Sequence, residues 1–343
     1  MPHDTGASPT SIAVRTPGRL HLGMISFGNP AVPSFGGIGV MVDGLGVELR
    51  MTRAGDLSAS GPSAGRAEQH ARACIEAWSL GTVGCRIEVV SAPRPHVGLG
   101  SGTQLALAVA AGMRHLFVDG SRSTAERRWS ASETIELAPV VGRGRRSCIG
   151  IYGFAGGGLV SEAGRLESEA GRRFSPLVAR VALPDAWRCV VFIQRDAEGL
   201  HGDAEKEAFA RLPPVPRDIS AELSRIASEE LVPAAAQGRF ALLCDAIHRY
   251  GRLAGRPFEP ESSRLPYHAA IGRLIDLLDA LGYRGAAQSS WGPAIMACCE
   301  SAASAGQLVA ECTRRGLDAT HEITIARFDS QGAVLRDNQA DAA

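Results

Sequence analysis

The sequence has no excess of charge of either sign: Lys and Arg total 36, and so do Asp and Glu. Proteins that bind nucleic acid usually carry a basic excess, so this balance argues against a nucleic-acid partner. The chain also lacks a run of about 18 consecutive apolar residues, which a membrane-spanning helix requires, and we expect no membrane span. Apolar residues nevertheless make up 45% of its 343 positions, enough for a sizeable core in one or two domains.

A targeting signal is also missing from the first ten residues, which contain neither a basic region nor an apolar stretch. We expect residues 1–10 to form a disordered lead-in and the protein to be cytoplasmic. None of the eight cysteines belongs to a C-x-x-C pair, whereas a zinc site requires clustered ligands. Scattered cysteines in a cytosolic protein act mostly as small buried hydrophobic residues, and we expect that role here.

The hydrophobic pattern interleaves strand-like and helix-like segments without a regular βαβ series, which predicts the α+β class. Extended segments are expected at 11–16, 36–52 with a bend at Asp43-Gly44, 85–90, 149–161, 177–183, 188–193, 294–299 and 321–327. Helices are expected at 66–80, 104–117, 132–141, 205–211, 219–235, 240–253, 263–281 and 302–315. The polar, arginine-rich stretch at 164–175 is interpreted as a boundary between domains at 11–165 and 175–330, and residues 331–343 as a flexible tail.

The strongest chemical signal is a glycine-rich turn at 95–104, directly before an apolar helix. Glycines let the backbone approach a ligand closely, and a helix start offers unpaired N–H groups and a partial positive charge. Together they predict an anion site suited to phosphate, in preference to an ordinary strand-to-helix turn. The turn is not a Walker loop, because Gly-Lys-Ser/Thr is missing, and not a dinucleotide fingerprint, because the third glycine is missing. The residues assigned to phosphate binding are Gly98, Leu99, Gly100, Ser101, Gly102, Thr103 and Gln104.

Two further segments carry basic side chains beside glycines. Arg19 and His21 alternate with leucines, so both face one side of an extended segment, either at a functional edge or on a solvated face. Arg143, Arg145 and Arg146 crowd into the segment 142–150. Arginine binds phosphates and carboxylates through paired hydrogen bonds. The alternative is a solvated surface cluster, but the flanking glycines and the apolar segment that follows favour partial burial.

Small and polar residues also lie at the ends of two later strands, in segments 199–205 and 288–293. Ligands commonly bind at such places. The first segment contains His201, although a lone histidine is more often structural. The second contains Gln288, Ser289, Ser290 and Trp291, of which the tryptophan either stacks on a ligand ring or, more commonly at such a place, packs in the core.

The chain resembles the GHMP small-molecule kinase superfamily over nearly its whole length. Members carry a Pro-Gly-Arg/Lys segment near the start, as at 16–23, a Pro-x-x-x-Gly-Leu-Gly-Ser loop, as at 95–103, and a glycine-containing strand segment near the end, as at 285–298. The resemblance implies a two-domain α+β fold. The N-terminal α/β domain is expected to be of the ribosomal protein S5 type, and the C-terminal domain to be ferredoxin-like.

Within this superfamily, segments 96–106, 142–150, 199–202 and 288–293 are similar to those of the β-ribofuranosylaminobenzene 5'-phosphate synthase family. That resemblance implies a pentosyltransferase that joins 5-phosphoribosyl diphosphate (PRPP) to 4-aminobenzoate, releasing carbon dioxide and diphosphate, in the first step of tetrahydromethanopterin biosynthesis. It also implies magnesium or another divalent metal, no organic cofactor, and a homodimer. The sequence leaves open whether the acceptor is 4-aminobenzoate or a hydroxybenzoate analogue, because one polar contact decides this.

One departure separates the chain from the kinases of the superfamily. The kinases place an acidic residue near the position of Ser147–Gly150 as catalytic base, whereas this chain has no carboxylate there until Glu162. The synthase reaction needs no strong base at the attacking carbon, because aromaticity returns by loss of carbon dioxide instead of a proton. The protein must instead neutralise diphosphate, exclude water and orient the ring.

The resemblance and the chemistry of the side chains together imply roles for individual residues. We assign Arg19, His21, Arg145, Arg146 and His201 to catalysis, with the arginines contacting phosphates or the aryl carboxylate. Gln288, Ser289, Ser290 and Trp291 are assigned to the aryl substrate. Ser101 and Glu136 are assigned to the metal, because magnesium prefers hydroxyl, carboxylate and phosphate oxygens. Two alternatives stay open: an ATP-dependent GHMP kinase acting on a small alcohol, and a non-catalytic ligand-binding protein on the same scaffold.

Overall fold

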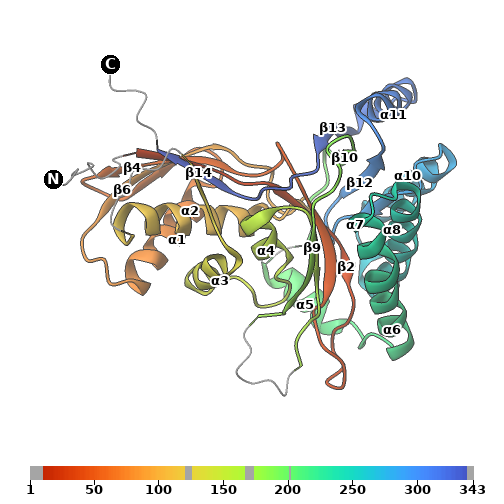
Figure 1. Cartoon of the computed structure of the whole chain (residues 1–343), viewed down its shortest axis with the longest axis horizontal. Coiled ribbons are helices and arrows are strands. Elements are labelled where there is room, and N and C mark those ends of the chain that lie inside the picture. The colour runs from red at the N-terminus through yellow and green to blue at the C-terminus, as the bar shows by residue number, and fades with distance from the viewer. Residues whose placement is uncertain (1–10, 120–125, 167–173, 201, 338–343) are drawn as a thin grey trace.

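The computed structural model describes residues 11–119, 126–166, 174–200 and 202–337. Its strands form three sheets, flanked by helices that fill the spaces between and around them. Figure 1 shows the first sheet and the early helices at one end of the molecule, and the later helices at the other. Strands β2 and β9 lie between these two halves.

The first sheet has six strands in the order β5-β6-β4-β1-β14-β7. These are β1 (Ser11–Arg15), β4 (Glu48–Ala54), β5 (Ser58–Ser60), β6 (Gly84–Ser91), β7 (Arg127–Arg128) and β14 (Val334–Asp337). Helices α1 (Ala64–Ala77), α2 (Ser101–Phe117), α3 (Ala131–Val140) and α4 (Ile149–Gly156) share one apolar core with it. Helix α2 is apolar on nearly every side, because the sheet and the other three helices surround it.

The second sheet has four strands in the order β2-β3-β8-β9 and separates the two halves of the molecule. These are β2 (Gly18–Met24), β3 (Gly37–Val42), β8 (Leu159–Glu162) and β9 (Leu177–Val181). Helix α4 packs against β2, β3 and β8, whereas α8 (Phe240–Gly255) packs against β2. Strand β2 thus carries Arg19 and His21 to the junction between the halves.

The third sheet, in the order β11-β12-β10-β13, forms the C-terminal half. Its strands are β10 (Arg188–Gln194), β11 (Ala286–Gln288), β12 (Ala294–Cys299) and β13 (His321–Arg327). Helices α10 (His268–Ala280) and α11 (Ala302–Arg314) pack on one face. The other face meets α6 (Arg217–Arg225), α7 (Val232–Ala236) and α8, with a π-helical turn at Ile226–Leu231 between α6 and α7. Helices α5 (Gly202–Arg211) and α9 (Glu259–Ser262) and the short turns Arg256–Phe258 and Leu317–Ala319 complete the half.

The α+β prediction is confirmed, but three segments differ from expectation. Residues 149–156 form helix α4 instead of an extended segment; every residue from Ile149 to Ala155 is buried, so no amphipathic period marks the helix. Strand β9 pairs with β8 and therefore extends the first half beyond residue 165. Residues 334–337 form β14 against β1 instead of a flexible tail, because buried Leu335 completes the N-terminal core.

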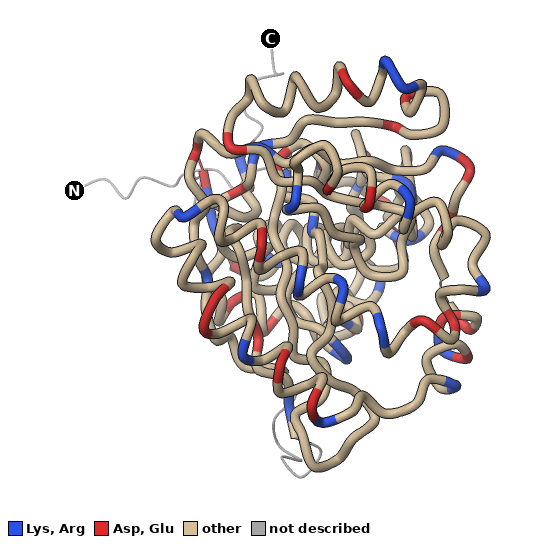
Figure 2. The backbone as a smooth tube through the Cα atoms, turned by 90° about the vertical axis from the view of Figure 1, so that its right-hand side faces the viewer, with Lys and Arg blue, Asp and Glu red and all other residues tan. Residues whose placement is uncertain are grey.

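Two predictions about the chain as a whole can be compared with the structure. All eight cysteines are buried and free, as expected. Within the described ranges, no helix combines the length and apolarity needed to cross a membrane. In the view of Figure 2, positions of Lys and Arg are interspersed with those of Asp and Glu along the backbone, as the balanced composition leads one to expect.

Candidate active site

A cavity of about 490 Å³ opens where β2, the segment 142–147, α5, α8 and the segment 288–291 meet. Its lining includes Arg19, Thr103 and the arginine-rich segment, as well as aromatic and small residues. Both halves of the chain contribute to it. Such concave junctions between domains are where small ligands usually bind.

The glycine-rich turn ends at Gly100, which precedes α2 with a φ of +67°. No side chain caps this helix, and the amides of Thr103 and Gln104 turn back to the Gly100 carbonyl at 3.0 and 3.2 Å. The amides of Ser101 and Gly102 at the helix start therefore remain for a ligand. A helix N-terminus of this kind favours an anion.

Arginine side chains press directly against this helix start. A Cβ atom at Gly100 would lie 3.0 Å from Nε of Arg19, and one at Gly102 would lie 2.6 Å from Nη2 of Arg66. Arg143 is the next neighbour of Gly102, with Nη2 at 3.8 Å from the same hypothetical atom. Gly100 favours glycine because its φ of +67° is one that other residues rarely adopt, whereas at Gly102 the flexible end of Arg66 would have to shift to admit a side chain.

These arginines have no acidic partner. Among the described residues, no carboxylate lies within ion-pair distance of Arg19, Arg66, Arg143 or Arg145. Burial lowers the pKa of Arg19 to about 10, and burial together with the neighbouring Arg66 lowers the pKa of Arg143 to about 10. Both groups still carry their charge at neutral pH. A cluster of unpaired cations beside a helix N-terminus is suited to a ligand with several negative charges.

His21 adds a neutral hydrogen-bond donor to the cavity wall. Burial, and secondarily the charge of Arg19, lower its pKa to about 3. Its Nδ1 accepts a hydrogen bond from the Gly23 amide at 3.2 Å, which assigns the ring proton to Nε2. Nε2 is buried and has no partner within the protein. An orphan donor on a ligand cavity is the natural partner of a ligand oxygen.

The segment 288–292 fastens the glycine-rich turn to β2. Ser289 is fully buried; its hydroxyl donates to the Gly98 carbonyl at 2.7 Å and accepts from the His21 amide at 2.9 Å. The Gln288 side chain donates to the Gly292 carbonyl at 3.1 Å and so closes the segment on itself. Ser290 has a φ of +53° and accepts a hydrogen bond from Nη1 of Arg19 at 3.1 Å. The later half of the chain thus positions both the turn and Arg19.

Carboxylates on the cavity wall are all engaged. Glu205 pairs with Arg146 at 2.7 Å, and Glu259 lies 3.1 Å from His268. Glu162 lies behind the wall, fully buried, with Oε2 accepting the Cys148 amide at 2.8 Å. Burial raises the pKa of Glu162 to about 7, against the opposing effects of nearby hydroxyl and amide donors and of Arg19. No unpaired carboxylate therefore faces the cavity from the described residues.

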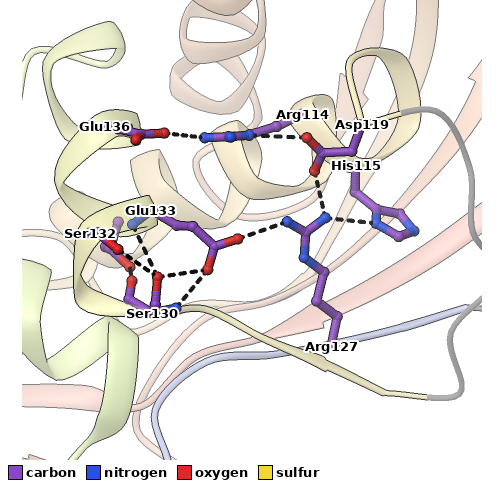
Figure 3. Close-up of polar contacts among 9 residues, drawn as sticks. Arg114, His115, Asp119, Arg127, Ser130, Ser132, Glu133 and Glu136 are labelled. Carbon is purple, nitrogen blue, oxygen red and sulfur yellow. Dashed lines mark hydrogen bonds and ion pairs between the residues drawn. The ribbon is translucent and has the colours of Figure 1, made fainter.

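The structure does not bring together Ser101 and Glu136, the two residues predicted to bind the metal. Glu136 is exposed on α3 and pairs with Arg114 at 2.9 Å (Figure 3). Arg114 lies near the last turn of α2, and a rise of about 1.5 Å per residue puts it roughly 20 Å from Ser101. In the part of the chain that the structure describes, no group of three or more His, Cys, Asp or Glu side chains is arranged to hold a metal ion.

The other assigned residues divide into cavity-lining and supporting positions. Cavity-lining positions are Arg19, His21, Thr103, Arg145, Arg146, Gln288, Ser290 and Trp291. Leu99 and Gln104 are instead buried beneath the turn, with the Gln104 amide donating to the Gly150 carbonyl at 2.9 Å. Gly98 packs against the Ser289 carbonyl, and Ser289 supports the turn from behind. His201 lies outside the described residues.

Sequence reasoning missed several residues around the cavity. Arg66 reaches the turn from α1, and no local signal distinguishes it from a solvated helix residue. Arg143 was recognised within its cluster but received no role, although it lies nearer to Gly102 than its neighbours do. Phe209 and Phe258 also line the cavity. They come from short helical segments, where an aromatic residue ordinarily indicates core packing.

Comparison with known proteins now identifies the superfamily. Residues 67–157 match the GHMP kinases N terminal domain, and residues 231–318 match the GHMP kinases C terminal domain. Homoserine kinase from Cytophaga hutchinsonii has the same fold, with a TM-score of 0.67, 17% sequence identity and coverage of 98% of this chain and 99% of that one. Mevalonate pyrophosphate decarboxylase from Streptococcus pyogenes gives a TM-score of 0.62 at 11% identity, covering 94% and 98%.

Sequence relatives narrow the family further. The β-ribofuranosylphenol 5'-phosphate synthase of Archaeoglobus fulgidus is 30% identical over 299 residues, which cover 84% of this chain and 88% of that enzyme. The enzyme of the same name from Methanothermobacter thermautotrophicus is 28% identical over 312 residues, covering 83% and 87%. The chain belongs to the GHMP kinase superfamily and, within it, to the family of the β-ribofuranosylphenol 5'-phosphate synthases.

Proposed function

We propose that this protein transfers the 5-phosphoribosyl group of PRPP to the ring of 4-aminobenzoate, with release of diphosphate and carbon dioxide. The observation that carries the proposal is the combination of unpaired arginines at the start of α2 with a cavity wall that has no unpaired carboxylate. Unpaired arginines suit PRPP, because this donor carries several negative charges. A wall without an unpaired carboxylate suits a reaction that needs no general base. The names of the sequence relatives point to the same class of phosphoribosyl product.

The reaction can be written so that atoms and electrons balance. The bond between the anomeric carbon and diphosphate breaks, and the electron pair leaves with diphosphate. The ring carbon that carries the carboxylate forms the new carbon–carbon bond. The bond to the carboxylate carbon then breaks, its electron pair restores the aromatic ring, and neutral carbon dioxide departs. No proton is removed from carbon, so the protein has no need of a base at that position.

The residues of the chain supply charge neutralisation and orientation. Arg19, Arg143 and the amides at the start of α2 would stabilise the negative charge that develops on diphosphate. Arg145 lines the same wall and would contact the 5-phosphate or diphosphate. His21 would donate from Nε2 to a ribose or phosphate oxygen, and it would not serve as a general acid at neutral pH, because a pKa of about 3 leaves its imidazole unprotonated there.

Among the described residues, no group of three or more His, Cys, Asp or Glu side chains could hold a divalent metal. Ser101 and Thr103 place hydroxyl groups in the first turn of α2, and Glu136 lies at the other end of this helix. We assign no reaction step to a metal. Magnesium remains a component to test, since PRPP carries phosphate oxygens that bind it without a protein cage.

The biological setting forms part of the same proposal. The product would be the first arylated ribose phosphate of tetrahydromethanopterin biosynthesis, made by a cytoplasmic pentosyltransferase that acts as a homodimer without an organic cofactor. A hydroxybenzoate acceptor would give a ribofuranosylphenol phosphate by the same bond changes. Paired assays with both acceptors would decide between them.

The direct test supplies purified protein with PRPP, magnesium and either 4-aminobenzoate or 4-hydroxybenzoate, and identifies the products by mass spectrometry. We expect an arylated ribose 5-phosphate that has lost the carboxylate carbon. Parallel reactions replace PRPP with ATP and candidate small alcohols. Phosphorylation of an alcohol, with no arylated ribose from PRPP, would contradict the proposal and support the kinase alternative.

A further inference from the structure

Part of the cavity lining is aromatic. Phe209 of α5, Phe258 and Trp291 all line the cavity and are each partly exposed to it. Their rings are mutually close: the centroids of Phe258 and Trp291 are 5.4 Å apart at 89°, and those of Phe209 and Trp291 are 6.2 Å apart. We call these three side chains the aromatic wall.

A buried ring holds the aromatic wall in place from behind. Phe27 is only 2% exposed, and its centroid lies 5.0 Å from those of both Phe209 and Phe258. The three rings are therefore packed against the core on one side and partly exposed to the cavity on the other. Partly exposed aromatic faces on a concave surface are the usual lining of a site for an apolar or aromatic ligand. In addition, the Trp291 indole nitrogen is buried without a hydrogen-bond partner.

Arg146 stands at the edge where the aromatic wall meets the arginine-rich wall. Its guanidinium lies over the Phe209 ring, 4.8 Å from the centroid, and its Nη1 lies 2.7 Å from Oε1 of Glu205. Unlike Arg19 and Arg143, it is neutralised by a carboxylate from within the protein. Two arginine environments, one unpaired and one paired, thus face the same cavity.

We propose that the aromatic wall is the acceptor subsite and binds an aromatic carboxylic acid by ring stacking, with the carboxylate at the Arg146–Glu205 pair. This inference rests on the proposed function and specifies where its acceptor binds. Stacking on the wall turns the ring carbon that bears the carboxylate towards the arginine-rich wall, where the anomeric carbon of the donor would lie. The carboxylate then sits at the boundary between the walls, beside Arg146.

The pairing of Arg146 with Glu205 suits a carboxylate that must be lost. A free guanidinium would stabilise the charged carboxylate in the ground state, but the departing carbon dioxide is neutral and would lose that stabilisation. Only interactions stronger in the transition state than in the ground state accelerate a reaction. The ion pair of Arg146 and Glu205 has no net charge, so hydrogen bonds from Arg146 would orient the carboxylate of the substrate without strongly stabilising it. Glu205 is accordingly a positioning residue that acts through Arg146.

The first test measures acceptor binding directly by calorimetry, using 4-aminobenzoate with and without diphosphate present. We compare Phe209→Leu with Phe240→Leu, a matched change at a ring that packs on Trp187, 5.1 Å away, outside the cavity. We expect Phe209→Leu to weaken 4-aminobenzoate binding roughly five- to tenfold, the size of a lost aromatic contact, and Phe240→Leu to leave it unchanged. Diphosphate binding should be unchanged in both variants. Equal effects of the two substitutions, or none from Phe209→Leu, would overturn the proposed subsite.

The second test separates a role for Glu205 in the reaction from a role in folding. Glu205→Gln leaves Arg146 as an unpaired cation, so we expect 4-aminobenzoate to bind about tenfold more tightly while kcat falls. Binding of aniline, which has the ring and amine but no carboxylate, should not change. A loss of thermal stability with no divergence between KM and kcat would contradict the positioning role.

These outcomes are distinct from those of the proposed function. If the parent protein binds 4-aminobenzoate on the aromatic wall but forms no arylated ribose phosphate from PRPP, the proposed reaction fails and the subsite stands. If it forms the product but Phe209→Leu and Trp291→Phe both bind 4-aminobenzoate as the parent does, the reaction stands and the subsite is wrong.

Discussion

The two ends of helix α2 carry similar numbers of arginines and use them in opposite ways. At the start of the helix, Arg19, Arg66 and Arg143 crowd around glycines and have no carboxylate partner in the described chain. At the far end, Arg114 and Arg127 are each shared between two carboxylates (Figure 3). We interpret the first end as an anion site, whereas the other end is a closed network that joins α2, α3 and β7.

The two ends differ in whether the arginines have carboxylate partners within the protein. We infer that this pairing, and not the number of arginines, distinguishes a binding site from a structural cluster. In the network of Figure 3, Asp119 accepts from both Arg114 and Arg127, at 3.2 and 2.5 Å, and Glu133 accepts from Arg127 at 3.1 Å. Glu133 also completes the capping box of α3 with Ser130. Every charge there is satisfied inside the protein, so nothing is left for a ligand.

The largest effect should come from removing unpaired arginines. We expect the double variant Arg19→Ala and Arg143→Ala to lower kcat/KM for PRPP by about a thousandfold, because each charged hydrogen bond contributes about 1.5–3 kcal/mol. Its melting temperature should be unchanged or higher, because like charges are removed. The matched double variant Arg114→Ala and Arg127→Ala should retain its kinetics at a temperature where it stays folded. Comparable kinetic losses in the two double variants would remove the distinction between the ends of α2.

The next largest effect is the pH dependence of stability caused by Glu162, a buried carboxyl group near Arg19. The pKa of Glu162 is about 7 in the folded state and has its ordinary value of 4.5 in the unfolded state. Between these two pH values the folded state keeps the proton and the unfolded state has lost it, so the free energy of unfolding falls as the pH rises from 4.5 to 7. The loss should be up to about 3 kcal/mol, from about 1.4 kcal/mol per unit of pKa difference. Glu162→Gln should abolish it, so the variant should gain stability over the parent between pH 5 and pH 8.

Urea denaturation at several pH values would measure that difference. The nearby Arg19 and Tyr250 interact with Glu162 but titrate well above pH 8, so they add no pH dependence in this range. A constant difference between parent and variant over this pH range would mean that Glu162 is already ionised in the folded protein at pH 5.

A smaller effect is expected at the far end of α2. Arg127→Ala removes the bonds to Asp119 and Glu133 and the contact with the Trp129 ring, whose centroid is 4.0 Å from the guanidinium carbon. We expect a loss of about 1–2 kcal/mol in the free energy of unfolding, since the group is partly buried within a network. Calorimetric unfolding would measure it, with PRPP kinetics as the readout that should not move.

The smallest effect is predicted for Glu136, which pairs with Arg114 and is 63% exposed at its side chain. Glu136→Ala should change stability by less than about 0.5 kcal/mol, as is usual for exposed ion pairs. The dependence of activity on magnesium concentration should be identical to that of the parent protein. A raised magnesium requirement would restore Glu136 as a metal ligand and contradict its position in the structure.

The sequence allowed prediction of features that depend on neighbouring residues. The glycine-rich turn and the apolar helix after it are adjacent in the chain, so the phosphate-type site could be inferred before the structure was known. The strand that carries Arg19 and His21 was recognised by its alternation. The resemblance to a superfamily, which the comparisons confirm, supplied the order of the two domains.

Features that depend on distant segments could not be predicted in this way. Arg66 meets Gly102 only because α1 packs beside α2, and the aromatic wall is assembled from positions 209, 258 and 291. The separation of Glu136 from Ser101 could not be predicted, because an acidic residue on a helix gives no local sign of which end of a neighbouring helix it faces. Strand β14 was missed because its partner β1 lies at the opposite end of the chain.

The most direct test of the account is the stoichiometry of the products. Purified protein is given limiting PRPP, magnesium and carboxyl-labelled 4-aminobenzoate, and labelled carbon dioxide and diphosphate are both counted. The account predicts one carbon dioxide for each diphosphate, with neither formed when one substrate is omitted. Release of diphosphate without carbon dioxide, or consumption of ATP in place of PRPP, would contradict the claim that the unpaired arginines at the start of α2 bind PRPP for a phosphoribosyl transfer with loss of carbon dioxide.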